Sequence, residues 1–372
     1  MEKEIKRKAN KLILVGNGFD LALGLKTTYN DFILWFLKDE VKIAVNSGNI
    51  TIENFKTING YTKNDLFELF LDAKYTIVDY DKIFEEQKDV LKFLDIIKKY
   101  KFRLKSSSDL FNAIIKDAEF NWVDIESIYF ELLKSILNVK NRNLEKIDKL
   151  NSDLVFLIKK LIEYLKTINT EISNKDASLF LNHFKNYVTN DELLIKESFD
   201  DFGATYFLNF NYTDSITKLI KQLPSHLQLE ENNIHGTLEN SESIIFGFGD
   251  EMDKIYNDIE ELNDNRFFEH IKSFKYFKSK NYRELLRFLD NEYFQVCIYG
   301  HSCGLSDRVM LNEIFEHENC KSIKIYYHEN DEGKNDFVEK TMEISRHFKN
   351  NKDMRRKILD FNEQCKIPQI KL

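Results

Sequence analysis

The sequence predicts an α/β protein with a mainly parallel sheet, a large α-helical insertion and a helical C-terminal tail. Short apolar runs that alternate with helix-like segments lie at the start and in the second half of the chain, a pattern typical of parallel sheets. Between them, from about Ile52 to Glu197, apolar residues recur every three or four positions, as they do in helices. A helical block inserted between two halves of one sheet explains both observations.

Each element of the sheet follows from a local pattern. The first strand is expected at residues 11–15, before a glycine-rich turn and an apolar-periodic helix from Tyr29 to Leu37. After Gly203, strands are expected at 205–210, 244–248, 294–299 and 322–327, and helices at 214–223 and 282–289. The tail is expected to be helical from 331 to 361, with one face formed by Phe337, Thr341, Ile344 and Phe348.

The helical block contains one long stripe of apolar residues. Between Ile147 and Leu165 these residues are spaced alternately by three and four, as in the seam between two helices. The stripe fits a helical hairpin within the chain and also fits self-association into a homo-oligomer, and the sequence leaves both open. Residues 106–109, Ser-Ser-Ser-Asp, precede another apolar run and are typical of a helix N-cap.

These patterns divide the chain into three parts. Residues 1–50 and 198–330 are expected to form a discontinuous Rossmann-like nucleotide-binding domain, and residues 51–197 the helical insertion. Residues 331–372 are expected to be C-terminal helices that pack on the core. A length of 372 residues exceeds most single cores, but the absence of a long polar linker favours one domain with an insertion over two separate domains.

Composition narrows the class of function. The formal net charge of −8 disfavours binding to duplex nucleic acid, because such binding relies on positive charge that displaces counterions. The N-terminus lacks the apolar core of a signal peptide, and no window is long and apolar enough to span a bilayer, so we expect a cytoplasmic protein with no membrane partner. The four cysteines contain no Cys-x-x-Cys pair, so no metal site is expected.

A glycine-rich turn follows the first expected strand and consists of Gly16, Asn17, Gly18, Phe19 and Asp20. Phosphate groups bind where backbone N–H groups converge at a helix N-terminus, and glycine is needed where a side chain would block the approach. We therefore expect this turn to contact the phosphates of a nucleotide, although a strand-to-helix turn without a ligand has the same pattern. Asp20 suits phosphate less well, and we expect it to cap the helix or to face a ribose.

Two further polar clusters follow expected strands. Asn211 and Tyr212 come after residues 205–210, and open parallel sheets bind their ligands at the C-terminal ends of strands. An asparagine there can hydrogen-bond a ribose hydroxyl or a water, but it is also an ordinary turn residue. His235, followed by Gly236, can move a proton near neutral pH, whereas an isolated histidine is more often structural. The presence of the other clusters favours the functional interpretation.

A fourth cluster contains Gly300, His301, Ser302 and Asp307 and again follows an expected strand. It is a second candidate loop for phosphate or ribose. Residues 300–304 also match the Gly-x-Ser-x-Gly pattern of a hydrolase nucleophile elbow, which would need a later acid and a later histidine. Both are present downstream, so a nucleophilic Ser302 is a less favoured alternative.

As a set, the motifs resemble the bacteriophage abortive infection family AbiH. The resemblance spans nearly the whole chain, in order, through residues 16–20, 24–32, 122–126, 210–213, 234–236 and 300–302. It implies a bacterial defence protein that arrests or kills an infected cell before phage is released. A phage-encoded trigger is then an expected partner.

The same motifs resemble a distant version of the sirtuin-like NAD-binding fold, in which a Gly-x-Gly loop, an asparagine and a His-Gly pair surround the nicotinamide ribose. This resemblance implies NAD or a related nucleotide as substrate or ligand, with no further cofactor required. It implies Asn211 and His235 as catalytic residues. The other contacts it implies are at Gly16, Asn17, Gly18, Phe19, Asp20, Asp31, Tyr212, Gly236, Gly300, His301, Ser302 and Asp307.

Bacterial immunity proteins with this fold usually hydrolyse NAD, and the sequence therefore predicts an NAD glycohydrolase. Asp20 stands where sirtuins carry Ser, no Arg follows Asp31-Phe32, and a four-cysteine zinc module is missing, so protein deacetylation is disfavoured. In this hypothesis Asn211 orients the ribose or a water, and His235 acts as general base towards a ribose hydroxyl.

Two other classes of function stay open. In one, the same loops bind a nucleotide without chemistry, and the helical block recruits a phage or host partner. In the weaker one, Asp124 and Glu126 belong to an RNA nuclease, but two carboxylates two residues apart on a helix do not share a face.

Overall fold

The computed structural model describes residues 8–47, 57–74, 84–118, 124–137, 144–193, 201–249 and 254–370. The chain forms two compact units. The first comprises Met1–Lys26, Ile168–Tyr256 and Ile271–Leu372, and the second comprises Thr27–Thr167 and Asn257–His270.

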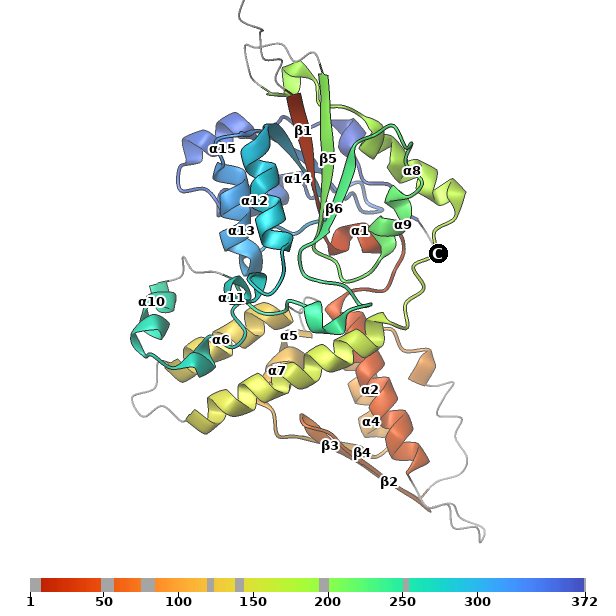
Figure 1. Ribbon diagram of the computed structural model, residues 1–372. Coiled ribbons are helices and arrows are strands. Elements are labelled where there is room, and N and C mark those ends of the chain that lie inside the picture. The colour runs from red at the N-terminus through yellow and green to blue at the C-terminus, as the bar shows by residue number, and fades with distance from the viewer. Residues whose placement is uncertain are drawn as a thin grey trace, which may run out of the picture. The chain divides into compact units, whose positions relative to one another are not determined.

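A five-stranded sheet organises the first unit (Figure 1). Its strands are β1 (Lys8–Val15), β5 (Asp201–Asn209), β6 (Leu229–Asn233), β7 (Tyr293–Tyr299) and β8 (Cys320–Tyr326). They lie in the order β6-β5-β1-β7-β8, and each neighbouring pair is parallel. The chain builds outward from β1 to β6, returns to the other side of β1, and continues to β8. This is the doubly wound order 3-2-1-4-5 of Rossmann-like sheets, so the predicted fold class is confirmed.

Helices cover both faces of this sheet (Figure 1). Along β1, Leu12 and Leu14 point to one face, while Ile13 and Val15 point to the other, as the period of two requires. The first face packs on α12 (Asn281–Asn291), α13 (Arg308–Glu316), α14 (Phe337–Ser345) and α15 (Asn351–Lys357). The second packs on α1 (Asn17–Ala22), α8 (Asn174–Lys185) and α9 (Ser215–Ile220). Burial on both faces explains why residues 12–15 of β1 and most of β7 are apolar.

The C-terminal tail supplies α14 and α15. Ile344 and Phe348 are buried in the core beside β8, and Phe337 packs against the same core. The face predicted from the apolar spacing therefore contacts the sheet layer. Residues 331–336 lie before the helix and form a turn instead of continuing it.

One expected strand does not form, and one strand of the sheet was not predicted. Residues 244–248 form no strand of the sheet, and only Phe248 makes an isolated bridge, to Ile271. The sheet takes β6 instead, whose sequence Leu-Glu-Glu-Asn-Asn has one apolar residue. Because β6 lies at the edge of the sheet and is mostly half-exposed, its sequence lacks the apolar run that marks a central strand.

The second unit is not purely helical, which corrects the expectation for residues 51–197. Its helices are α2 (Tyr29–Asn46), α4 (Val90–Lys99), α5 (Asp109–Asp117), α6 (Ile125–Leu137) and α7 (Leu144–Leu165), and α10 (Lys254–Glu261) runs across the boundary between the units. An antiparallel sheet is formed by β2 (Thr57–Lys63), β3 (Phe67–Lys74) and β4 (Phe102–Ser106). Buried Phe67, Leu69 and Leu71 alternate along β3, but Phe67, Phe70 and Leu71 also have helical spacing, which hid the strand.

The apolar stripe of α7 is covered by the chain's own helices. Its residues are buried, and α7 packs against α2, α5 and α6 within the second unit. The three-and-four spacing is therefore accounted for inside one chain. The N-cap predicted at residues 106–109 is confirmed, since the Ser108 hydroxyl accepts the Phe111 N–H at 3.0 Å at the start of α5.

The boundaries between the units differ from the expected ones. The second unit begins at Thr27 instead of residue 51, because α2 packs against β2, β3 and α7. Helix α8 was expected in the insertion but belongs to the first unit. Its Phe180 and Phe184 are buried against the sheet.

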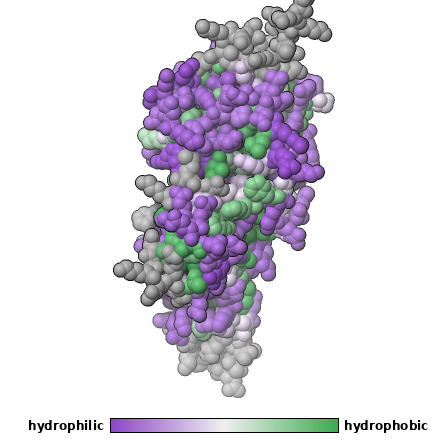
Figure 2. All heavy atoms as spheres, turned by 60° about the vertical axis from the view of Figure 1, so that its left-hand side comes forward, coloured by the Kyte–Doolittle hydropathy of each residue, from purple (hydrophilic) through white to green (hydrophobic). Residues whose placement is uncertain are grey.

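Figure 2 shows a face that is mostly hydrophilic and interrupted by smaller hydrophobic areas. This fits the charged share of 31%. Among the helices of the described residues, none combines the length and the apolar character needed to cross a bilayer.

Candidate functional site

Four turns leave the same edge of the first unit's sheet. They follow β1, β5, β6 and β7, and cover residues 16–20, 210–215, 234–237 and 300–307. Because the four strands are parallel, their C-terminal ends meet at one edge, where doubly wound sheets bind ligands. Apart from Asp31, every residue predicted to contact the nucleotide lies on these turns.

The turns after β1 and β7 are in direct backbone contact. The Gly16 N–H donates to the Tyr299 carbonyl at 3.2 Å, and the Gly18 N–H donates to the Gly300 carbonyl at 2.8 Å. A Cβ on Gly18 would lie 2.7 Å from the Gly300 oxygen, and a Cβ on Gly16 would lie 2.4 Å from the His301 Cα. The space that these glycines leave is thus filled by the chain itself, whereas we expected it to admit a phosphate.

Of the neighbouring residues of the first turn, Asn17 is exposed and Phe19 faces inward. Asn17 opens α1, which is only six residues long. The Phe19 N–H donates to the Gly16 carbonyl at 2.9 Å, and its buried ring packs edge-on against Phe180 and Tyr299. This turn is therefore a packing element of the sheet edge.

Asp20 is buried and faces the turn after β5. Its carboxylate accepts the Thr213 hydroxyl at 2.6 Å and also the Ser215 hydroxyl. Burial raises the pKa of Asp20 to about 6, and hydrogen bonds from Ser215, Thr213 and Asn211 oppose that rise. Asp20 therefore connects α1 to the second turn and, with 1% of its surface exposed, is not placed to contact a ribose directly.

Asn211 lies between the first two turns. Its Nδ2 donates to the Gly16 carbonyl at 3.1 Å, and its backbone N–H donates to Asn209 Oδ1 at 3.0 Å. Asn209 in turn donates to Asn233 Oδ1 at 2.8 Å, which links β5 to the end of β6. Tyr212 points elsewhere, and its hydroxyl donates to the Ile245 carbonyl at 3.0 Å.

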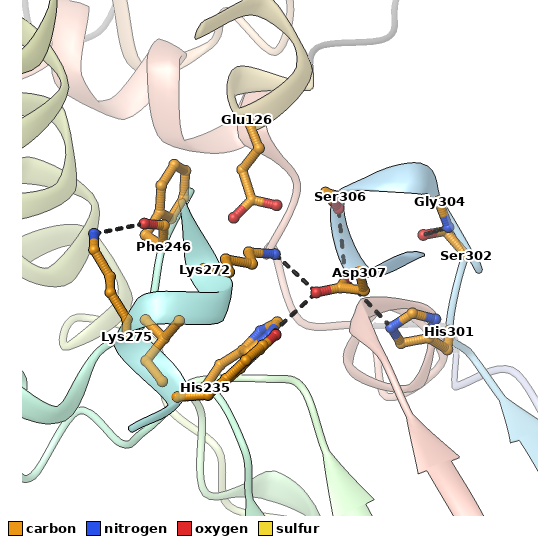
Figure 3. A network of polar contacts seen from close by, with 12 residues as sticks. Glu126, His235, Phe246, Lys272, Lys275, His301, Ser302, Gly304, Ser306 and Asp307 are labelled. Atoms are coloured by element: carbon orange, nitrogen blue, oxygen red, sulfur yellow. Dashed lines mark hydrogen bonds and ion pairs between the residues drawn. The ribbon is translucent and has the colours of Figure 1, made fainter. Parts of the chain in front are cut away.

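His235 belongs to a buried polar cluster whose shared partner is Asp307 (Figure 3). Its Nε2 lies 3.2 Å from Asp307 Oδ1 and 3.3 Å from the Tyr276 hydroxyl, and the ring hydrogen-bonds the Phe210 carbonyl. Burial lowers the pKa of His235, Lys272 lowers it further, and Asp307 opposes both. His235 is therefore neutral near pH 7 and beside a carboxylate that would stabilise its protonated form.

Asp307 brings the cluster together. Its Oδ1 contacts Lys272 Nζ at 2.9 Å, and both side chains are buried, with Lys272 on the short helix α11 (Lys272–Tyr276) (Figure 3). Although burial alone would raise the pKa of Asp307, the Lys272 ammonium and His235 hold it well below the usual value. Asp307 was expected from the sequence, whereas Lys272 was not, since nothing marks it among 54 lysines and arginines.

His301 is held neutral in the same cluster. Its Nδ1 accepts the Cys303 N–H at 2.9 Å, so the proton of the neutral ring is assigned to Nε2, 3.8 Å from Asp307 Oδ2. Burial lowers the pKa of His301 to about 3. Ser302 is exposed, and its hydroxyl accepts the Gly304 N–H at 3.4 Å. No histidine contact to the Ser302 hydroxyl occurs within the described residues, which leaves the nucleophile-elbow hypothesis without support.

The remaining predicted residues, Asp31, Gly236 and Asp124, have other structural roles. Asp31 belongs to the second unit, where it forms a capping box with Thr28 at the start of α2. Gly236 follows His235 with φ +85°, and its N–H donates to the Asn233 carbonyl at 3.0 Å. Asp124 caps α6 through the N–H groups of residues 126 and 127. Residue 122 of the same motif lies outside the described residues. In the described part of the chain, no three His, Cys, Asp or Glu side chains gather as metal ligands would.

The model of one protein family, described as bacteriophage abortive infection AbiH, matches residues 12–329. The chain belongs to the AbiH family. The match includes all four turns of the sheet edge and the whole of the second unit. No curated protein and no solved structure matches the chain. Membership of AbiH associates the chain with abortive infection, a defence against bacteriophage.

The tight contact between the turns after β1 and β7 leads to a stability prediction for this AbiH chain. Gly300 has φ +75°, and an added Cβ would lie 2.2 Å from the Phe19 backbone nitrogen. Gly333 has a similar φ of +78° but open space around it. We expect Gly333→Ala to cost about 1–2 kcal/mol from backbone strain alone, and Gly300→Ala to cost at least twice as much. Urea unfolding of both variants measures the difference, and equal losses would contradict the importance of the contact.

The buried ion pair of the AbiH cluster leads to a second prediction. Asp307→Asn would remove the carboxylate that lies 2.9 Å from the buried Lys272 ammonium, so we expect a loss of about 3–5 kcal/mol in unfolding free energy. The double variant Asp307→Asn/Lys272→Met removes both charges and should recover most of that loss. Thermal and urea unfolding of both variants and of Lys272→Met complete the cycle. Additive losses would mean that the pair is not coupled.

Proposed function

We propose that this AbiH protein binds NAD or a related nucleotide at the edge formed by the four turns and hydrolyses the nicotinamide–ribose bond. The observation that carries the proposal is the position of His235. It follows β6 at the ligand-binding edge of a doubly wound sheet, and it lies next to a buried carboxylate.

The surroundings of His235 suit a proton acceptor. The Phe210 carbonyl and the Asp307 carboxylate both accept hydrogen bonds from the ring, whereas a neutral imidazole has a single N–H to donate. When the ring takes up a proton, both nitrogens donate, and Asp307, 3.2 Å from Nε2, stabilises the imidazolium. A histidine oriented by one acceptor and stabilised in its charged form by a carboxylate is a common arrangement for general base catalysis.

Asn211 supports the proposal from the neighbouring turn. The adjacent residue, Phe210, packs edge-on against the His235 ring, with centroids 5.2 Å apart. The backbone that carries Asn211 therefore also shapes the surroundings of His235. In the proposed roles, Asn211 orients the ribose or the attacking water while His235 takes a proton from a ribose hydroxyl or from that water.

The reaction would break the bond between ribose C1′ and the nicotinamide nitrogen, whose electron pair leaves with nicotinamide. Water would add its oxygen to C1′ of the oxocarbenium-like intermediate and release one proton, so the products are nicotinamide and ADP-ribose. His235 is 4% exposed, and its Nε2 contacts the Tyr276 hydroxyl. Substrate would therefore have to displace Tyr276, which α11 carries, to reach the ring.

Nicotinamide release by the purified protein tests the proposal. We expect NAD cleavage, alone or with lysate from phage-infected cells, and a loss of at least about 10²-fold in His235→Gln and in Asn211→Ala. His183→Gln is the matched control, because His183 is a partly buried histidine of the same unit, on α8, that contacts the Tyr299 hydroxyl at 3.0 Å instead of Asp307. Circular dichroism and melting of each variant check that the fold is retained.

The outcomes separate the classes of function. Full activity in His235→Gln would reject the assignment of the base. Higher melting temperature with NAD, but no nicotinamide release under either condition, would favour the nucleotide-sensing binding protein, because a ligand that binds only the folded state stabilises it.

A further inference from the structure

The outer side of α11 carries two phenylalanine rings that face water. Among the large apolar side chains of the described residues, Phe277 has the largest exposed fraction, 80%, and Phe274 has 49%. The two lie three residues apart on α11 and its C-cap, so they are neighbours on the helix surface. Tyr276, between them, is buried and contacts His235. The segment therefore presents one aromatic side chain to the interior and two to solvent.

Contacts on the inner side hold α11 in place. The Lys272 N–H donates to the Phe248 carbonyl at 2.9 Å, and Lys275 Nζ donates to the Phe246 carbonyl at 3.0 Å (Figure 3). Both contacts tie the helix to the segment that follows β6. The two exposed rings are thus presented by an ordered helix, and a ligand that binds them would not have to order the chain first.

Cationic side chains continue from these rings into α12. The exposed ones are Lys278, Lys280, Arg283 and Arg287, and Glu284 is the single acid between residues 277 and 287. This segment therefore has a formal charge of +3, whereas the whole chain has −8. We call the two phenylalanines and the four cations the basic–aromatic surface.

The start of α12 concentrates positive charge where a helix tolerates it least. The N-terminus is the positive end of the helix dipole, so acidic side chains are favoured there. Lys280 is the N-cap of α12 and makes no side-chain capping bond, and Arg283 lies in the first turn, where Glu284 offsets one of the two charges. This arrangement does not favour the stability of the helix, but it favours contact with an anion.

We propose that the basic–aromatic surface binds single-stranded nucleic acid, with bases stacked on the two rings and phosphates contacting the four cations. Every base has a flat face that an aromatic ring can contact, and the backbone supplies a negative charge at each nucleotide. In a duplex these faces are covered by the neighbouring base pairs, so the rings select a single strand. This binding is separate from the proposed nucleotide chemistry and does not require it.

An anionic membrane is the competing partner, because phenylalanine and lysine also occur together at membrane surfaces. Segments that lie on membranes bury a broad apolar face to which aliphatic residues contribute. Between residues 274 and 287, both exposed large apolar side chains are phenylalanines. The aliphatic residues of that range are turned inward, since Leu285 is buried and Leu286 packs against the core. The composition therefore favours nucleic acid.

Fluorescence anisotropy of labelled oligo(U) and oligo(dT) tests stacking on the full-length protein in the absence of NAD. With strands of about 20 nucleotides, we expect Phe277→Ala to raise Kd at least about 5-fold, because it removes one stacking platform. Val338→Ala is the matched control, since Val338 is 61% exposed on α14 but is aliphatic, and its Kd should equal that of the wild-type protein. Tighter binding of one strand identifies RNA or DNA, and either agrees with the proposal.

The salt dependence of Kd tests the phosphate contacts. Lys278→Gln/Lys280→Gln should lower the slope of log Kd against log salt concentration by about 1.4, because each phosphate contact on a single strand contributes about 0.7. Arg355→Gln/Arg356→Gln removes two exposed cations from α15 of the same unit and should leave the slope unchanged. Phe277→Ala should also keep the slope, because it removes no charge. Circular dichroism checks that each variant retains the fold.

Three results would overturn the proposal. Equal losses in the two double variants would mean that total charge, and not this surface, attracts the strand. An unchanged Kd in Phe277→Ala would reject stacking. Binding to phosphatidylserine-containing vesicles that falls in Phe277→Ala, with no binding of either strand, would assign the surface to a membrane. Since NAD is absent from every measurement, failure here leaves the proposed function standing, and loss of the proposed function leaves this surface to be judged on its own result.

Discussion

Backbone contact between the turns after β1 and β7 determines the geometry of the whole sheet edge. The Gly18 N–H bonds the Gly300 carbonyl, and neither glycine has room for a side chain. The Gly16 carbonyl is thereby placed to accept from Asn211, which orders the turn after β5. Beyond Gly300, the same chain continues into His301 and Asp307, and Asp307 holds His235 and Lys272. One close approach of two turns therefore connects the residues that we propose for binding and catalysis.

This contact also changes where a ligand can lie. Doubly wound sheets usually bind ligands where the strand order reverses, which here is between β1 and β7. That position is occupied by the chain's own backbone, as the isolated bridge between Val15 and Gly300 indicates. The polar side chains with proposed roles come instead from the turns after β5 and β6. In the proposed reaction, the reacting end of the ligand would therefore lie on the β5–β6 side of the edge.

Sequence analysis predicted the parallel sheet and most of the residues at its edge, because central strands and glycine turns have strong local patterns. Apolar β1 and β7 were predictable for this reason, whereas the edge strand β6, with one apolar residue in five, was not. The role of the glycines was harder to predict, since a turn that admits phosphate and a turn that admits another backbone use the same residue. The role of Lys272 could not be predicted from any local sequence pattern, because only the folded chain brings it to Asp307.

Burial explains the electrostatics of the cluster. His301 and His235 have lowered pKa values because both are enclosed, and Asp20 has a raised one for the same reason. Asp307 behaves differently because Lys272 supplies an opposite charge at 2.9 Å. The edge therefore contains two buried acids with different behaviour. Asp307 is ionised because the Lys272 ammonium lies beside it, whereas the pKa of Asp20 is about 6.

The central place of β1 has a consequence for synthesis of the protein. Lys11 pairs with Thr205 on one side and with Gln295 on the other, so the first strand made has partners that emerge much later. Contacts between such distant residues form slowly, and a chain leaving the ribosome cannot complete this sheet before β7 is available. The four turns meet only at that stage. A truncated translation product that lacks β7 would therefore leave the turns after β1, β5 and β6 without the turn that joins them.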